Sequence, residues 1–146
     1  MNSMDFPQVT DVDRSAHNGH NGHNGQSIVP LLECCYASAY RALEGDDLQN
    51  AQRLFGVMAV MAMRDERAWI GLATIQERTG QWRAAAGLYG VATALIPTSA
   101  WSHFGKGRNL LQLGRTQEAE LCFGKAEQLT DDPHLLRALA QERGLS

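Results

Sequence analysis

Long apolar runs are absent from this chain, and so is an excess of either charge. No segment approaches the roughly eighteen consecutive apolar residues of a transmembrane helix, and Met1 to Gln26 contain no continuous apolar stretch like that of a secretory signal. The formal net charge of -3 gives no electrostatic reason to expect nucleic acid as a partner. These absences favour a cytoplasmic protein that neither spans a membrane nor binds nucleic acid.

Cysteine and histidine are scarce in the part of the chain that can fold. The three cysteines, Cys34, Cys35 and Cys122, form no pair at the spacing of a zinc site or a CxxC redox motif. His103 and His134 lie in no motif with a nucleophile or a metal site. We therefore expect no enzyme activity, no bound metal and no cofactor.

Strand patterns are missing as well, because no segment alternates apolar and polar residues. From Ile28 onward apolar residues recur at helical spacing, and glycine, aspartate and proline mark the ends of helices. Asp132 is expected to cap the last helix, with Pro133 at its first position and Gly144 after its end. The predicted helices cover about residues 32–44, 48–63, 66–79, 82–95, 100–113, 116–129 and 133–143.

What the chain does contain is a motif that returns every thirty-four residues, clearest between Trp69 and Pro97. Such a period, with small residues at fixed offsets, is typical of the tetratricopeptide repeat, a helix hairpin that buries its apolar face only by stacking on a neighbour. The predicted fold is all-α, with three such hairpins and a C-terminal capping helix in a right-handed stack. The domain would cover residues 28–146, with repeats at about 32–65, 66–99 and 100–133 and the capping helix at 133–143.

Small residues and aromatic rings occupy matching positions in the three repeats. A small residue at a helix crossing lets the two axes approach closely, and a ring four residues later shares its face. The crossing residues are Ala39, Ala73 and Gly107 on the first helices and Ala51, Ala85 and Ala119 on the second, followed by the rings Phe55, Tyr89 and Phe123.

Repeat one is the least regular copy. Asp46 stands where Gly80 and Gly114 stand in the later repeats, and Met63 replaces Pro97. Its helix ends are therefore less sharply defined by sequence. A methionine cluster on its second helix is either core or an adaptable patch for a partner or for self-association.

The first helices of stacked hairpins line the concave side, so their remaining positions predict a groove. Two tyrosines, a tryptophan and a phenylalanine would make it aromatic, and aromatic side chains often anchor protein interfaces. Phe104 and Leu111 could instead be core residues that pack against the next hairpin or against the C-terminal helix. The predicted groove residues are Tyr36, Tyr40, Leu43, Ile70, Thr74, Glu77, Trp101, Phe104, Arg108 and Leu111.

The first 27 residues differ from the rest and contain three copies of His-Asn-Gly. Asn-Gly favours turns and the segment has little that could fill a core, which predicts a disordered tail over residues 1–27. Because short His-rich tracts can bind transition metals, a metal-handling role for His17, His20 and His23 remains an alternative.

The repeats resemble the class II chaperones of type III secretion systems. The resemblance rests on the segments 36–40, 71–73, 80–82 and 110–114, on Ala51 and Phe55, and on Glu118-Ala119-Glu120. It covers about Leu31 to Leu129. The His-Asn-Gly copies have no counterpart in that family.

This resemblance implies that the chain binds hydrophobic secreted translocator proteins in the cytoplasm and keeps them soluble before export. The partner would lie as an extended segment in the concave groove, against Tyr36, Tyr40, Ile70, Thr74, Phe104 and Arg108. Members of the family often form dimers, so a homodimer is possible. The alternative is a general repeat adaptor or scaffold subunit, for which more basic residues in the groove are expected.

Overall fold

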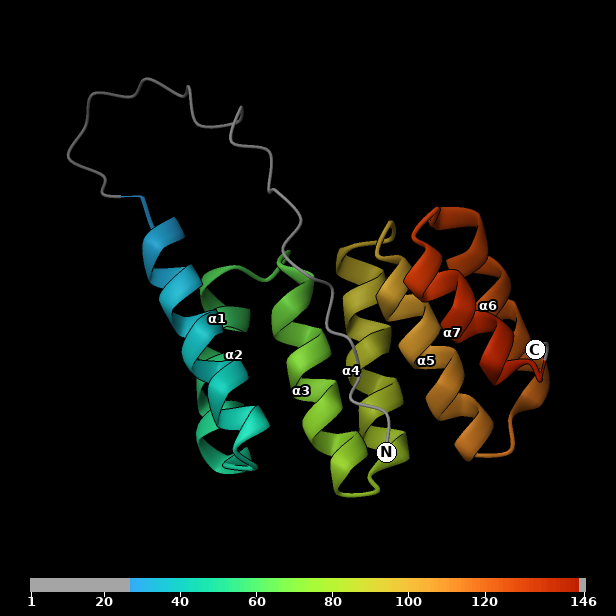
Figure 1. Cartoon of the computed structure of the whole chain (residues 1–146), viewed down its shortest axis with the longest axis horizontal. Coiled ribbons are helices and arrows are strands. Elements are labelled where there is room, and N and C mark those ends of the chain that lie inside the picture. Colours follow the sequence, from blue (N-terminus) through green and yellow to red (C-terminus); the bar gives the residue numbers. More distant parts are fainter. Residues whose placement is uncertain (1–26, 145–146) are drawn as a thin grey trace.

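The structure of this protein is a computed structural model that describes residues 27–144. The described part is a row of antiparallel helices without strands, and Figure 1 shows it from the side, with the long axis of the row horizontal. The helices are α1 (Val29–Glu44), α2 (Leu48–Met61), α3 (Glu66–Arg78), α4 (Trp82–Leu95), α5 (Ala100–Gln112), α6 (Thr116–Leu129) and α7 (Pro133–Glu142).

The predicted helices are confirmed, with the ends of α3, α5 and α7 one residue earlier than expected and larger shifts in repeat one. Helix α1 begins at Val29, three residues earlier than expected, because Pro30 in the first turn has the backbone angle of a helix and needs no intrahelical partner for its missing N–H. Helix α2 ends at Met61 rather than Met63. The Asp132 carboxylate accepts a hydrogen bond from the backbone N–H of His134, as expected of a cap.

The turns inside the three hairpins share one backbone conformation. Gly80 and Gly114 have φ of 73° and 76°, and Asp46 at the equivalent position of the first hairpin has φ of 60°. Glycine takes this left-handed conformation without steric cost, whereas aspartate is strained there. The first hairpin therefore keeps the turn despite losing the glycine.

The small residues predicted at the helix crossings are buried, as are the rings that follow them. Ala39, Ala73, Ala51, Ala85 and Ala119 are completely inaccessible, and Phe55, Tyr89 and Phe123 are at most 1% exposed. A larger side chain at a crossing would push the two helices apart.

Glycines on the following hairpin receive two of these rings. A Cβ atom on Gly71 would overlap the ring of Phe55, and a Cβ atom on Gly105 would overlap the ring of Tyr89. In both cases a ring from a second helix packs onto the backbone of the next first helix. We call each of these a ring–glycine contact, and the two contacts join the three hairpins.

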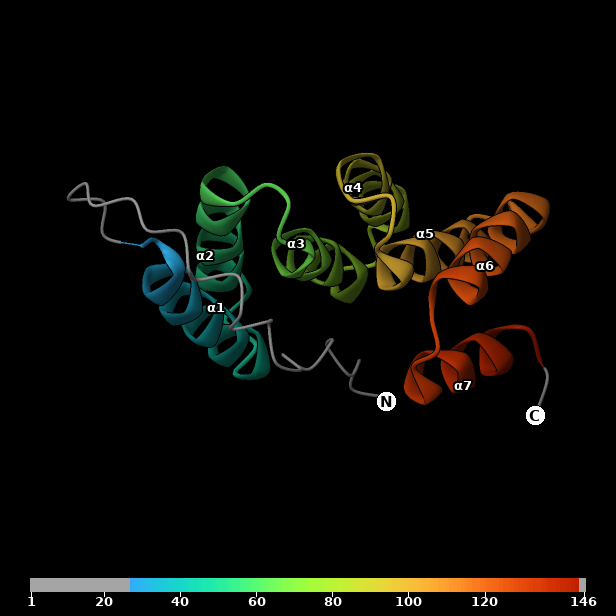
Figure 2. The ribbon, with the colours of Figure 1, turned by 90° about the horizontal axis from the view of Figure 1, so that it is seen from above.

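The row curves toward its first helices. Helix α1 contacts α3 and α3 contacts α5, whereas α2 and α4 do not contact each other in the described part, and neither do α4 and α6. Figure 2 shows α2 and α4 on one side of the row and α1, α3 and α7 on the other. We call the surface formed by α1, α3 and α5 the inner face. No helix of residues 27–144 is long and apolar enough to cross a membrane.

Candidate functional site

Two tyrosines of α1 lie on the inner face and remain partly accessible. Tyr36 and Tyr40 are half-buried, pack against the core of the first two hairpins, and have ring centroids 6.1 Å apart. Burial raises the pKa of the Tyr36 hydroxyl, which therefore stays protonated at neutral pH. The pair offers aromatic surface together with phenolic oxygens.

Trp101 of α5 is also half-buried, and it packs against both buried clusters of the protein. Its ring meets Phe104 edge to face, with centroids 5.9 Å apart. Because Tyr36 and Tyr40 pack on the first of these clusters, the three accessible rings share one core beneath them.

Four of the predicted groove residues are part of the interior in this structure. Leu43, Ile70, Thr74 and Phe104 are only 1–4% exposed. Thr74 donates a hydrogen bond to the carbonyl oxygen of Ile70. We expected these four side chains to be accessible in the groove, and this expectation is corrected. The first helices pack closely enough to bury these positions, so the side chains lie beneath the inner face and support it.

Phe104 is covered by α7. It belongs to the same buried cluster as Leu135 and Leu139 of α7, and its ring lies 6.0 Å from that of Phe123. The half-buried Leu111 packs against this cluster too. Phe104 and Leu111 therefore pack in the cluster beneath the capping helix and do not form an open part of the groove.

Glu77 and Arg108 form an ion pair between α3 and α5. The Glu77 carboxylate accepts hydrogen bonds from Arg108 Nη2 and from Asn109 Nδ2, each at 2.6 Å. Although burial opposes the charged form of Arg108, the adjacent Glu77 carboxylate raises the pKa of its guanidinium. Burial also raises the pKa of Tyr89, with a further contribution from Glu77. The inner face thus has a partly buried ion pair at its centre.

Sequence reasoning missed Arg67, although the repeat period could have found it. Arg67 stands thirty-four residues after Glu33 and thirty-four before Trp101. The Arg67 guanidinium donates hydrogen bonds to the carboxylates of Glu33, at 2.8 Å, and Asp65, at 2.7 Å. It also lies 4.5 Å from the centroid of the Tyr36 ring. The hydrogen bonds to Asp65 are the main reason that the pKa of Arg67 is raised.

Polar contacts link neighbouring first helices at both of their ends. Helices α1 and α3 are joined by Glu33 with Arg67 at one end and, at the other, by Arg78, which donates to the carbonyl oxygen of Leu43 at 2.6 Å. Helices α3 and α5 are joined by Glu66 with Ser99 and by Glu77 with Arg108. These contacts fix the spacing of the helices that carry the accessible rings.

The described residues offer no alternative site with metal chemistry. No group of three His, Cys, Asp or Glu side chains in this part of the chain could hold a metal ion. His17, His20 and His23, like almost all of the predicted tail, lie outside the described residues.

Comparison with known proteins identifies the fold. No protein-family model matches the chain, and no curated protein sequence matches it either. Among solved structures, the chain is similar to the translocator chaperone SycD of Yersinia enterocolitica in complex with a peptide of the translocator YopD. The two are 22% identical, with a TM-score of 0.72 over 84% of this chain and 93% of that one.

PcrH, from Pseudomonas aeruginosa, is similar to the same extent. In its complex with the chaperone-binding region of PopB it is 23% identical, with a TM-score of 0.71 over 84% of this chain and 98% of PcrH. An O-GlcNAc transferase of Thermobaculum terrenum also matches, at 21% identity and a TM-score of 0.69, but this chain covers only 23% of it. The chain therefore has the fold of the translocator chaperones, a stack of three tetratricopeptide-type helix hairpins closed by a C-terminal helix.

Proposed function

We propose that this protein is a chaperone of the bacterial cytoplasm that binds an extended apolar segment of hydrophobic type III secretion translocators. The segment lies on the inner face, and binding keeps the translocator soluble before export. The observation that carries the proposal is the group of half-buried rings, Tyr36, Tyr40 and Trp101, on a face held by polar contacts. The likeness to SycD and PcrH, both seen with translocator segments, supports it.

The physical basis is burial of ring surface on a face that is already formed. Aromatic side chains bury a large area with few rotatable bonds, so they contribute binding free energy at low entropic cost. A rigid face spares the cost of ordering the site when the partner binds. The partner segment still loses conformational entropy when it binds, which favours a short extended stretch with spaced apolar side chains.

The test is a double variant of the accessible rings, Tyr40→Ala with Trp101→Ala. We expect it to weaken binding of a fluorescently labelled chaperone-binding region of PopB by about 30-fold or more, since each anchor contributes about 1–2 kcal/mol. Fluorescence anisotropy measures the affinity, and circular dichroism checks that the helices remain. Phe104 is unsuited to this test because its truncation would leave a cavity in the interior.

Val91→Ala with Leu121→Ala is the matched control. Both side chains are exposed on second helices, at 42% and 76%, and lie away from the inner face. The control should bind like the unaltered protein. If the ring variant folds and binds the PopB region as tightly as the unaltered protein does, the inner face is not the binding site. If the PopB region binds neither the unaltered protein nor the variant, the proposed function is contradicted.

We also propose a homodimer through one end of the first hairpin. Ile28 and Leu31 at the start of α1 and Val60 and Met63 at the end of α2 are 49–84% exposed. Because the two helices are antiparallel, these side chains lie at the same end of the hairpin, and a patch of this kind marks an interaction surface. Leu31→Glu with Val60→Glu should turn a dimer into a monomer in sedimentation velocity; a monomeric unaltered protein would contradict the proposal.

The arginines of the inner face argue against a general adaptor that captures acidic tails. Arg67 is bound by Glu33 and Asp65, and Arg108 by Glu77, at distances between 2.6 and 2.8 Å. A pocket for a carboxylate would need basic side chains that are not already neutralised. This pairing favours an apolar partner segment over an acidic one.

A further inference from the structure

Helix α7 occupies the position of a first helix in a fourth repeat, but it lacks the glycine that would seat it closely. Gly71 and Gly105, each the sixth residue of its helix, receive the rings of Phe55 and Tyr89, whereas α7 contains no glycine and has Ala138 as its sixth residue. A Cβ atom at this position leaves no room for a ring against the backbone. The junction between α6 and α7 therefore has no ring–glycine contact.

The ring that would have made this contact turns back into its own hairpin. A Cβ atom on Gly107 would lie 2.7 Å from the Phe123 ring, and Phe123 also lies beside Phe104. As a result, α6 and α7 contact each other much less extensively than any other consecutive pair of helices. The last junction is the loosest in the described row.

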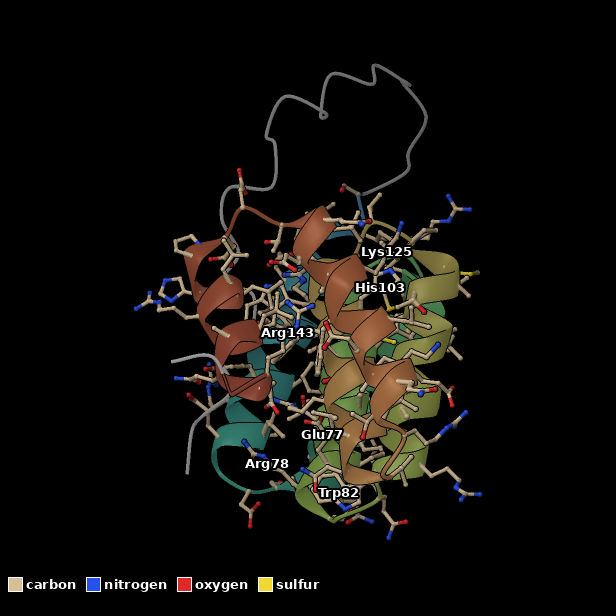
Figure 3. The ribbon with its side chains drawn as sticks, turned by 90° about the vertical axis from the view of Figure 1, so that its right-hand side faces the viewer. Glu77, Arg78, Trp82, His103, Lys125 and Arg143 are labelled. Atoms are coloured by element: carbon tan, nitrogen blue, oxygen red, sulfur yellow. The ribbon has the colours of Figure 1, made fainter. Side chains whose placement is uncertain are left out.

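Helix α7 is held by two leucines and one arginine. Leu135 and Leu139 are buried against α5 and α6. Arg143, just after the helix, bridges Glu120 and Glu127 of α6 at 2.7 and 2.9 Å, and Figure 3 shows it between the two ribbons. Both carboxylates are more than half exposed, so each ion pair is weak.

The surface beneath α7 is continuous with the proposed binding face. Phe104 and Leu111 of α5 pack in the cluster that α7 covers, and Trp101 lies at its border. The Glu142 carboxylate at the end of α7 also favours the charged form of Arg108, although less than the Glu77 carboxylate of α3 does. Moving α7 away would extend the aromatic surface past Trp101.

From these observations we propose that α7 is a displaceable strap, which covers an apolar surface of α5 and α6 that a partner's apolar segment uses when α7 opens. This rests on the proposed function for the identity of the partner, but opening of α7 can be measured without any partner. If α7 is open in only a small fraction of molecules, the apparent affinity for the partner is the intrinsic affinity multiplied by that fraction. Weakening the contacts that hold α7 increases the open fraction and therefore raises the apparent affinity.

The test reverses the charge of the bridging residue, with Arg143→Glu in the full chain. Repulsion from Glu120 and Glu127 should raise amide hydrogen exchange in α7 about tenfold, leaving α2 to α4 unchanged. Binding of the dye 8-anilinonaphthalene-1-sulfonate should increase as the surface over Phe104 opens. The labelled chaperone-binding region of PopB should bind about three- to tenfold more tightly.

Two further variants show whether the bridge is responsible. Arg83→Glu is the matched control, because Arg83 is exposed on α4, which does not contact α7 in the described part, and it should leave α7 exchange unchanged. Adding Glu120→Lys and Glu127→Lys to Arg143→Glu restores opposite charges and should return exchange in α7 to its original rate.

Each outcome decides between the claims. Unchanged exchange in α7, or equal acceleration in every helix, would overturn the strap. Faster exchange with no change in PopB affinity would show that the covered surface is not used, which also overturns the proposal. If PopB binds to no variant, the proposed function fails, and hydrogen exchange alone then decides whether α7 opens.

Discussion

Gly105→Ala is expected to destabilise the protein by about 3 kcal/mol or more, because the added methyl group has no room. The new Cβ would overlap the ring of Tyr89, which is itself only 1% exposed and cannot rotate into solvent. Either α5 or the ring must move, and both belong to the junction between the second and third hairpins. Urea denaturation followed by circular dichroism measures the loss.

The same substitution at Gly90 should have the opposite sign. Gly90 lies inside α4, and a Cβ atom there would meet nothing within 4 Å. Alanine is the better helix former by about 0.5–1 kcal/mol, so Gly90→Ala should stabilise the protein. Equal effects at the two glycines would contradict the ring–glycine contact as the element that joins the hairpins.

Glu77→Gln is expected to cost about 2–4 kcal/mol of folding free energy, since it removes the carboxylate that pairs with the partly buried Arg108 guanidinium. The side chains of this pair are only 21% and 10% exposed. The change also weakens a contact that holds α3 to α5, so binding of a translocator segment should fall together with stability. Denaturant unfolding and fluorescence anisotropy report the two losses separately.

Glu118→Gln provides the comparison at equal distance. Arg115 and Glu118 pair at 2.6 Å, the same distance as Arg108 and Glu77, but their side chains are 54% and 52% exposed. Water screens such a pair, and its loss should cost under about 0.5 kcal/mol. Similar losses at Glu77 and Glu118 would show that burial of the Arg108 pair contributes little.

The positions of the helices could be predicted because local chemistry defines them. Gly80 and Gly114 take a backbone angle that glycine alone adopts freely, and Asp132 caps α7 with its own carboxylate. The repeat period also identified the buried crossings, since a small residue followed by a ring recurs in each copy. Repeat one, where these signals are weaker, is where the predicted ends shifted by more than one residue.

The binding face was predicted less well, because exposure depends on how closely neighbouring helices approach. Tyr36 and Ile70 occupy the same repeat position, but Tyr36 is half-buried whereas Ile70 is 2% exposed. Arg67 was overlooked for a related reason: its role depends on Glu33, which is distant in sequence and close only after the first two hairpins stack.

Local chemistry along the chain is sufficient to predict the helices, the three hairpins and the residues at their crossings, because glycine conformation, capping and periodic small residues act over a few turns of one chain segment. The accessibility of the predicted groove residues, the pairing of the arginines and the packing of Phe104 beneath α7 become visible only in the folded structure. These outcomes depend on distances between helices that are far apart in the sequence, which local signals do not specify.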